Sequence, residues 1–256
     1  MPEAGTKNGA ELPTMSFLEH LDELRKRLWW SLLAVAVAFA IALSYARRIL
    51  DIFLAPIRPM LGDAKPVYLD LTEPFMLYMK VAFLMAIFIA APFILYQVWA
   101  FISPGLYPRE RRYAIPFILS GTGFFLLGGA FGYWIGFPTA CRFLLSVAEG
   151  FQPALRISTL FAFESKIVLG MGLVFELPTV IYFLARFGLV TAGFLWKNFK
   201  YAVLIIFIVA AIITPTPDMV TQLVFAAPMI LLYLIGILFA HLSGKSRSAA
   251  AGSDQS

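Results

Sequence analysis

The chain has 256 residues, of which 61% are hydrophobic and 14% are charged, and its mean hydropathy is +0.83. Soluble domains average about 45–50% apolar and about 25% charged residues, so this composition excludes an ordinary soluble protein and predicts an all-α integral membrane protein. The net charge of +5 does not indicate nucleic-acid binding, because the basic residues are scattered over short loops instead of gathering on one face.

The segment FLEHLDELRKRL, residues 17–28, predicts an amphipathic helix that leads into the first apolar run, whereas residues 1–14 have the composition of a disordered extension. The apolar residues of one face recur at helical spacing: Phe17, Leu21, Leu24 and Leu28. Two acid–base pairs have the four-residue spacing of helical ion pairs: Asp22 with Lys26, and Glu23 with Arg27. A solvated helix held by its own ion pairs is therefore one interpretation of these charges.

Six apolar stretches are candidates for membrane spans, since a crossing helix needs about 20 residues. Their approximate ranges are 28–46, 76–99, 114–137, 162–185, 201–214 and 219–240. The fifth is short, because its apolar core, 202–213, would extend only about 18 Å as a helix. The turn TPTPD joins it to the sixth, and a hairpin this short is expected to thin the bilayer locally.

Six crossings place both ends of the chain on one side of the membrane. Lys and Arg number 12 in the segments on that side and 6 in the segments on the other. By the positive-inside rule, this bias predicts that both termini are cytoplasmic. Residues 15–242 should then form the membrane domain, and residues 243–256 a disordered cytoplasmic tail.

The segment between the first two spans, 47–75, should lie on the outer surface. Its sequence RRILDIFLAPIRPML predicts an amphipathic helix that is broken at Pro56 and Pro59. On the third span, Gly128, Gly132 and Gly136 place a small residue at every fourth position. This pattern predicts a seam of close helix packing, and internal packing explains it better than the docking of a partner.

Sequence motifs of enzyme chemistry are absent. The chain contains neither a phosphate-binding G-x-x-x-x-G-K-[ST] loop, nor an H-E-x-x-H zinc helix, nor a G-x-S-x-G nucleophile elbow. The sequence therefore predicts that the protein is not an enzyme and that it binds no cofactor or metal.

Two further acids are candidates for function. Glu176 lies in the fourth span with nine uncharged residues on each side. Because an acid at this depth costs a few kcal/mol, it is expected to face the protein interior or water, although a structural hydrogen bond beside Pro178 is the alternative. Glu110 lies among Arg109, Arg111 and Arg112 in the loop after the second span, where local ion pairing is again a structural interpretation.

Four segments together resemble the TatC family, the multispanning core subunit of the twin-arginine protein translocase. They are HLDELRKRL at 20–28, ILYQVWAFISPGLYPRERR at 94–112, FELP at 175–178, and TPTPD followed by Gln222. The resemblance covers about residues 16–242. It implies six transmembrane helices in a concave, glove-like bundle with a short fifth and sixth hairpin, in the bacterial cytoplasmic membrane. It also implies a receptor for signal peptides with two consecutive arginines, which directs folded proteins to export driven by the proton-motive force.

The resemblance also implies roles for individual residues. Those that match signal-peptide-binding positions are Glu23, Arg25, Phe101, Leu106, Tyr107 and Glu110. Glu176 matches the intramembrane acid of the family, and Pro56 matches a proline of the first outer loop. Thr214 and Gln222 match polar positions of the hairpin where single-span TatA/TatB-type subunits dock, and TPTPD is one residue longer than the TPPD form of the family. Oligomers of translocase units are implied as well.

The two signal-binding acids suit the chemistry of two arginines. A guanidinium pairs with a carboxylate in a planar fork that lysine does not reproduce. We therefore expect Glu23 and Glu110 to clamp the two arginines at the cytoplasmic edge, with neighbouring basic residues partly displaced when the signal binds.

A proton-linked secondary transporter is the alternative function. It would use Glu176, Lys80 and Lys166 as an ion path. Such a transporter should show an internal repeat and polar residues in several spans, whereas this chain shows no repeat and concentrates its acids at the cytoplasmic face.

Overall fold

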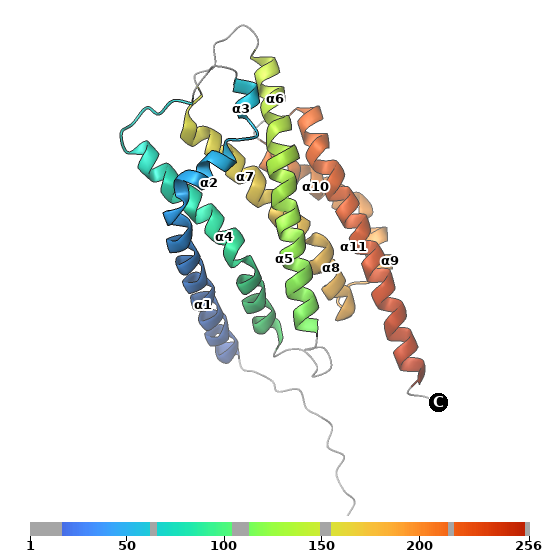
Figure 1. Cartoon of the computed structure of the whole chain (residues 1–256). Helices are drawn as coiled ribbons and strands as arrows, with labels where there is room; N and C mark the ends of the chain where they lie inside the picture. The colour runs from blue at the N-terminus through green and yellow to red at the C-terminus, as the bar shows by residue number, and fades with distance from the viewer. Residues whose placement is uncertain (1–16, 62–65, 104–112, 149–154, 215–217, 254–256) are drawn as a thin grey trace, which may run out of the picture.

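The computed structural model describes residues 17–61, 66–103, 113–148, 155–214 and 218–253. The described residues form helices, apart from short connections and one isolated bridge between residues 67 and 156. In chain order the helices are α1 (Phe17–Ser44), α2 (Ala46–Phe53), α3 (Arg58–Leu61), α4 (Glu73–Ile102), α5 (Ala114–Phe131), the π-helical turn η3 (Gly132–Gly136), α6 (Phe137–Val147), α7 (Ile157–Phe175), α8 (Leu177–Arg186), α9 (Ala192–Lys197), α10 (Phe199–Ile213) and α11 (Met219–Ser253) (Figure 1).

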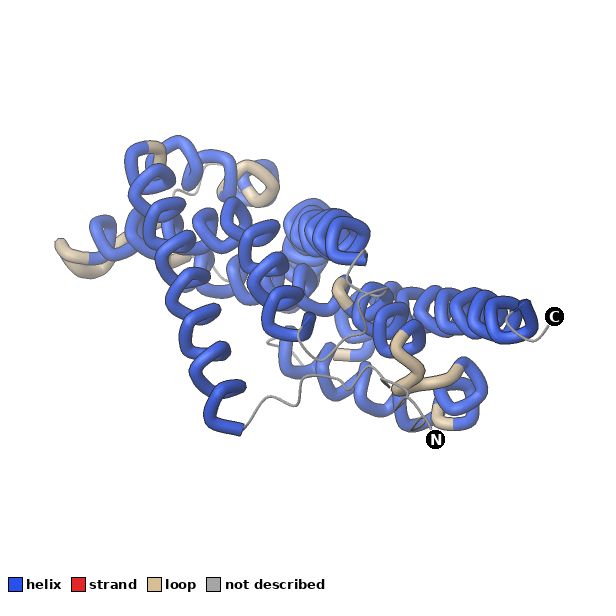
Figure 2. Tube along the Cα trace, turned by 90° about the horizontal axis from the view of Figure 1, so that it is seen from below, coloured by secondary structure: helices blue, strands red, loops and turns tan. Residues whose placement is uncertain are grey.

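Five helical segments in the described part of the chain are long and apolar enough to cross a membrane, which confirms an all-helical membrane protein. They are Leu18–Ser44, Glu73–Ile102, Ala114–Val147, Ile157–Arg186 and Met219–Leu242. The apolar helix α10 is shorter, at 15 residues, as the sequence predicts for the fifth span. Seen along the bundle, the helices spread into an elongated layer (Figure 2).

Two helices are longer than the sequence predicts. The third span continues about ten residues past 137, because the π-helical turn η3 and then α6, with Pro138 near its start, follow α5 without a break. Helix α11 continues to Ser253, into the segment for which we expected disorder. The division of the chain at residues 15 and 242 stays a prediction.

The ends of the bundle differ in what they carry. One end, which we call the N-terminal end, holds the start of α1, the end of α4, the start of α5, the end of α8 and the end of α11 (Figure 1). The other end, which we call the α2 end, holds α2, α3, the start of α7, the end of α10 and the start of α11. The first described helix thus begins, and the last one ends, on the same side, as an even number of crossings predicts.

The surface segment after α1 differs from its predicted form. The chain leaves α2 in a turn at residues 54–57, which contains Pro56, and α3 follows at once. Pro59 is the second residue of α3, so the prediction that the helix breaks at Pro59 is wrong. A proline in the first turn of a helix is tolerated because its missing N–H has no partner there in any case. Ile57 anchors the turn, since its side chain is fully buried in the largest core cluster.

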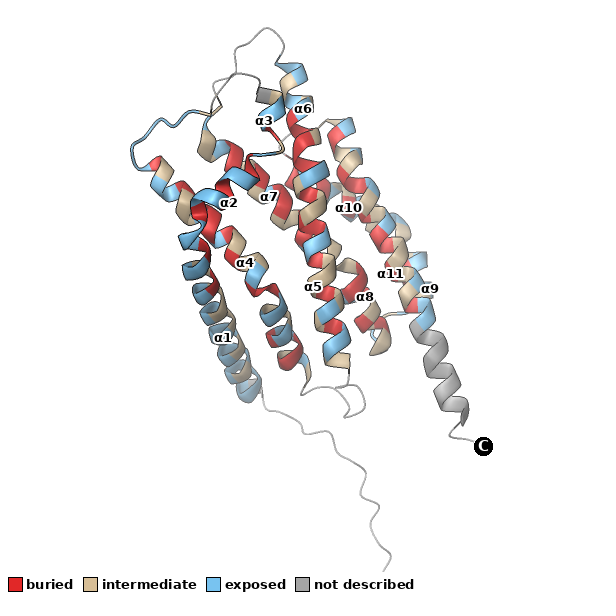
Figure 3. Cartoon of the chain, in the orientation of Figure 1, coloured by how far each residue is buried: buried red, intermediate tan, exposed pale blue. Residues whose placement is uncertain are grey.

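Small residues bring the spans into close contact. A β-carbon added to Gly128 would lie 2.4 Å from the Met171 carbonyl oxygen of α7, and one added to Gly132 would lie 2.9 Å from the Val168 Cα atom. The predicted glycine seam is therefore confirmed, and it joins α5 and η3 to α7. By contrast, α1 packs mainly on α4, and most of its surface is exposed (Figure 3).

A polar cluster ties the connections at the α2 end together. Glu73, at the start of α4, is buried and accepts hydrogen bonds from the Arg156 Nε atom at 3.0 Å and from the Leu69 and Ser158 backbone N–H groups. Beside it, the Val67 N–H donates to the Leu155 carbonyl oxygen at 2.9 Å. The hydrogen bonds to Glu73 raise the pKa of Arg156 above its usual value. This cluster joins the loop before α4 to the start of α7.

Candidate functional site

A chain of polar side chains at the N-terminal end links α1 to α4. The Arg27 Nε atom donates to the Glu23 carboxylate at 2.7 Å, one helical turn away. The same guanidinium donates through Nη1 to the Gln97 side-chain oxygen on α4 at 3.2 Å. Gln97 is buried, and the Glu23 side chain is 19% exposed. The Glu23 carboxylate is thus held in place and still open to solvent on one side.

The predicted ion pairs of α1 have different outcomes. The Glu23–Arg27 pair is present, whereas Asp22 and Lys26 are exposed and form no ion pair within the described residues. The reason is that Arg27 has a second partner on α4 that fixes its guanidinium, while nothing on α4 holds Lys26. Arg25 is also exposed.

Gln97 is a site residue that the sequence reasoning missed, although it lies inside a quoted motif. The signal was available: it is a polar amide within residues 81–108, a stretch without any charge. A buried amide in a membrane span needs a hydrogen-bond partner. The sequence did not identify that partner, because Arg27 lies 70 residues away.

Aromatic residues frame the loop that carries Glu110. The Phe101 ring, at the end of α4, stacks on His20 of α1 with ring centroids 4.4 Å apart. At the start of α5, Tyr113 lies under the Arg186 guanidinium of α8, 4.9 Å from the ring centroid, and its hydroxyl accepts a hydrogen bond from Arg186. The predicted site residues Leu106, Tyr107 and Glu110 lie outside the described residues. Both ends of their loop are nonetheless fixed close to α1 and α8.

Glu176 lies at a break between two helices. It ends α7 and precedes α8, and Pro178 follows in the first turn of α8. Its carboxylate is half-buried against α5, where a β-carbon on Gly121 would lie 3.2 Å from Oε2, and its Oε1 atom has no hydrogen-bond partner. A glycine at 121 thus leaves room for the acid.

A second intramembrane acid, Glu164, was missed by the sequence reasoning. Its side chain is fully buried in α7, and neither carboxylate oxygen has a hydrogen-bond partner. Its sequence context, between Phe163 and Ser165 and two residues before Lys166, suggested the edge of a span and not a buried face. The helical phase of α7 decides its burial, because α7 turns this face toward η3 and α6, near Tyr133 and Cys141.

The polar residues of the α10–α11 hairpin bond within the hairpin. The Gln222 amide of α11 donates to the Phe207 carbonyl oxygen of α10 at 3.1 Å. Thr214 is buried, and its hydroxyl donates to the Ala210 carbonyl oxygen at 2.9 Å. Asp218 accepts a hydrogen bond from the Thr221 backbone N–H. These bonds fix the short turn and leave apolar side chains on its outer faces, among them Ile208, Ile212, Met219 and Leu223.

The arrangement suits binding more than chemistry. Within the described part of the chain, no three His, Cys, Asp or Glu side chains gather in a way that could hold a metal ion. The N-terminal end instead offers a positioned carboxylate beside a buried amide and an aromatic stack, next to the exposed surface of α1.

Comparison with known proteins agrees with this reading. The family profile of the Sec-independent protein translocase protein (TatC) matches residues 19–228. A TatC protein of Koribacter versatilis is 48% identical over 235 residues, which cover 90% of this chain and 87% of the relative. One of Aquifex aeolicus is 37% identical over 238 residues, covering 91% of this chain and 98% of the relative. A crystal structure described as the twin-arginine translocase receptor TatC superposes with a TM-score of 0.76 at 38% identity, covering 88% of this chain and all of the other.

Proposed function

The chain belongs to the TatC family and is a receptor subunit of the twin-arginine translocase, and on this premise we propose that Glu23 and Glu110 together bind the two arginines of the signal peptide. As a translocase component the protein is not an enzyme. The observation that carries the proposal is the Glu23 carboxylate, which already binds an arginine, its own Arg27.

Arg27 supports the proposal because it occupies the position that a signal arginine would take. A partly exposed carboxylate that pairs with one guanidinium has the geometry to pair with another. When the signal binds, its first arginine displaces Arg27 from Glu23, and Gln97 keeps a hydrogen bond to the displaced side chain. Each charge-assisted hydrogen bond to a signal arginine contributes about 1.5–3 kcal/mol, less where salt screens it.

The remaining signal-binding residues surround this carboxylate. Phe101 is held by His20 shortly before the Glu110 loop begins, so the stack keeps the end of α4 next to α1. Leu106, Tyr107 and the exposed Arg25 would contact the signal peptide around its two arginines.

An apolar groove next to Glu23 fits the hydrophobic part of a signal peptide. It lies between α1 and α4, has a volume of about 400 Å³, and is lined by residues that include Trp30, Val37, Ile89 and Phe93. The groove starts two helical turns after Glu23 on the same helix. A peptide with its arginines at Glu23 would therefore place its apolar stretch along α1.

The test is the affinity of the purified protein for a fluorescent twin-arginine signal peptide. We expect Glu23→Gln and Glu110→Gln each to weaken binding by about 10- to 100-fold, which corresponds to about 1.4–2.8 kcal/mol. Asp22→Asn is the matched control, because Asp22 is the exposed neighbour of Glu23 and has no ion pair within the described residues. The proposal fails if both glutamine variants bind as tightly as the unchanged protein, or if a twin-lysine peptide binds equally well.

We further propose the wider setting that the family implies. The protein lies in the bacterial cytoplasmic membrane with its N-terminal end toward the cytoplasm, and its transport of folded cargo depends on the proton-motive force. It assembles with single-span TatA/TatB-type subunits and with other copies of itself. Glu176 receives a polar residue of a partner helix, and Pro56 shapes the outer loop that leads into α3.

The α10–α11 hairpin is the proposed docking site for a single-span subunit. Thr214 and Gln222 act there by fixing the turn, since their side chains bond within the hairpin. A photoreactive residue in place of the half-exposed Leu223 should capture a single-span subunit in native membranes. The same residue in place of Leu127, which is exposed on α5, is the control and should not. Equal capture from both positions would contradict a specific site.

A further inference from the structure

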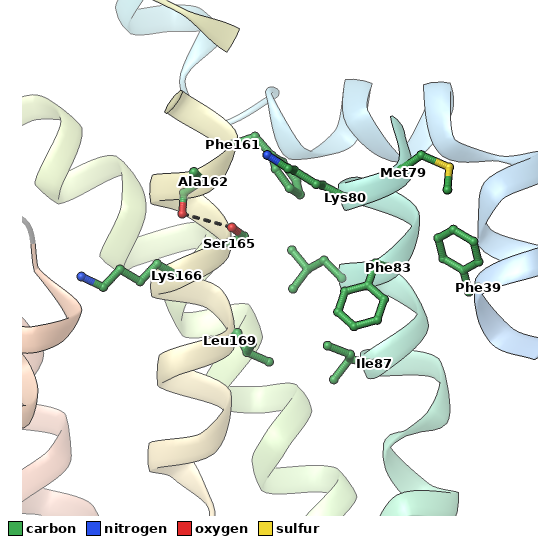
Figure 4. A pocket seen from close by; sticks show the side chains of 11 residues that line it. Phe39, Met79, Lys80, Phe83, Ile87, Phe161, Ala162, Ser165, Lys166 and Leu169 are labelled. Carbon is green, nitrogen blue, oxygen red and sulfur yellow. Dashed lines mark hydrogen bonds between the residues drawn. The ribbon is translucent and has the colours of Figure 1, made fainter. Parts of the chain in front are cut away.

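A second apolar cavity lies toward the α2 end, on the part of the bundle that the signal-binding proposal does not use. It has a volume of about 610 Å³ and opens between α1, α4 and α7. Most of its lining is bulky and apolar, and includes Phe39, Met79, Phe83 and Phe161 (Figure 4). All three helices are membrane spans, so the cavity lies within the depth of the bilayer.

Two lysines stand at this cavity, Lys80 of α4 and Lys166 of α7. The Lys80 side chain extends from α4 toward Phe161 on α7, whereas Lys166 contributes its stem and points its ammonium away from the cavity (Figure 4). Both are exposed, and neither forms an ion pair within the described residues. The Lys80 ammonium therefore stands at the apolar space, the Lys166 ammonium lies on the other side of α7, and no carboxylate of the described residues pairs with either.

The depth of these lysines is costly without an anion. Lys80 lies seven residues after the start of α4, or about 10 Å along the helix, and Lys166 lies nine residues after the start of α7, or about 14 Å. A lysine at the bilayer centre costs about 2.5–3.5 kcal/mol, and less where its flexible stem lets the ammonium reach toward the interface. A phosphate near the interface would pair with such an ammonium.

We propose that this cavity binds an anionic phospholipid, with its phosphate on Lys80, an acyl chain in the cavity, and the charge of Lys166 on the neighbouring helix adding to the attraction. The lining favours a flexible chain over a partner helix. A close helix contact needs small residues, whereas bulky side chains line most of this cavity, and Ala162 and Ser165 are the small ones among them. The hydroxyl of Ser165 on α7 also lines the cavity, where it donates to the Ala162 carbonyl oxygen at 3.1 Å (Figure 4). This site is separate from the signal-binding site at the N-terminal end.

The test measures stabilisation by lipid. The protein in neutral detergent is heated with a thiol-reactive dye, which reports unfolding through the buried Cys141, the only cysteine of the chain. Added phosphatidylglycerol should raise the unfolding midpoint by several degrees more than phosphatidylcholine does. Lys80→Gln with Lys166→Gln should remove this difference, and Lys80→Arg with Lys166→Arg should keep it. Lys197→Gln with Lys200→Gln, on α9 and α10, is the matched control and should also keep it.

Three outcomes would overturn the proposal. The first is an unchanged preference for phosphatidylglycerol in the double glutamine variant, and the second is an equal effect of inorganic phosphate. The third is measured with a photoreactive residue in place of Phe83 in native membranes, where we expect an adduct with the mass of a phospholipid. The proposal is overturned if the adduct is instead a protein, which would assign the cavity to a partner helix, or if no adduct forms.

Discussion

Gly128→Ala is expected to lower the free energy of unfolding by about 1–3 kcal/mol, although alanine is the better helix former by about 1 kcal/mol. The reason is the contact between α5 and α7. The added methyl group would lie 2.4 Å from the Met171 carbonyl oxygen and 2.7 Å from the Phe175 Cβ atom. A backbone carbonyl cannot rotate away as a side chain can, so the two helices must separate. The unfolding midpoint measured through Cys141 should fall by several degrees.

Gly123→Ala is the matched control on the same helix. Nothing lies within 4 Å of a β-carbon at this position, so the variant should gain stability from helix propensity alone. If both variants behaved alike, the close packing of α5 on α7 would not determine stability. A loss of stability in Gly128→Ala together with unchanged or higher stability in Gly123→Ala would show that the close contact between α5 and α7 causes the loss.

The second large effect is expected from Glu73→Gln at the α2 end. The variant keeps the shape of the side chain but removes the charge that accepts hydrogen bonds from Arg156 and from two backbone N–H groups. Because Glu73 is buried, this loss is not replaced by water. We expect the unfolding midpoint to fall by several degrees and the connection between α4 and α7 to become susceptible to protease.

The exposed ion pair between Asp51 and Arg58 provides the control for Glu73. Its N–O distance is 2.8 Å, shorter than that between Glu73 and Arg156, but its two side chains are 62% and 58% exposed. Exposed ion pairs contribute little, so Asp51→Asn should leave the midpoint unchanged within about a degree. An equally large loss from Asp51→Asn would mean that burial does not explain the effect of Glu73.

Much of the fold follows from local sequence because the bilayer imposes a length. Hydrocarbon thickness fixes the number of apolar residues in a span, and the backbone within it must form helix. The short α10 and the glycine seam on α5 could be predicted for the same reason. Predictions at surface breaks were less accurate, as at Pro59, since a proline permits either the end of a helix or the start of the next.

The candidate site divides in a similar way. The sequence predicted the Glu23–Arg27 pair, because both residues lie on one helix four positions apart. It did not predict that Gln97 would complete the pair, nor that Glu164 would be fully buried. The first depends on how α1 lies against α4, and the second on which face α7 turns toward η3.

The sequence by itself determined that this is a helical membrane protein of the TatC type with five long apolar helices and one shorter one, because composition, span length and contiguous motifs are properties of short segments. Only the tertiary structure decided which charged and polar groups are paired between different helices. Glu73 and Arg156 are 83 residues apart, and Arg27 and Gln97 are 70 apart. The physical reason is that hydrogen bonds act over about 3 Å, so a partner on another helix is defined only when the helices have packed.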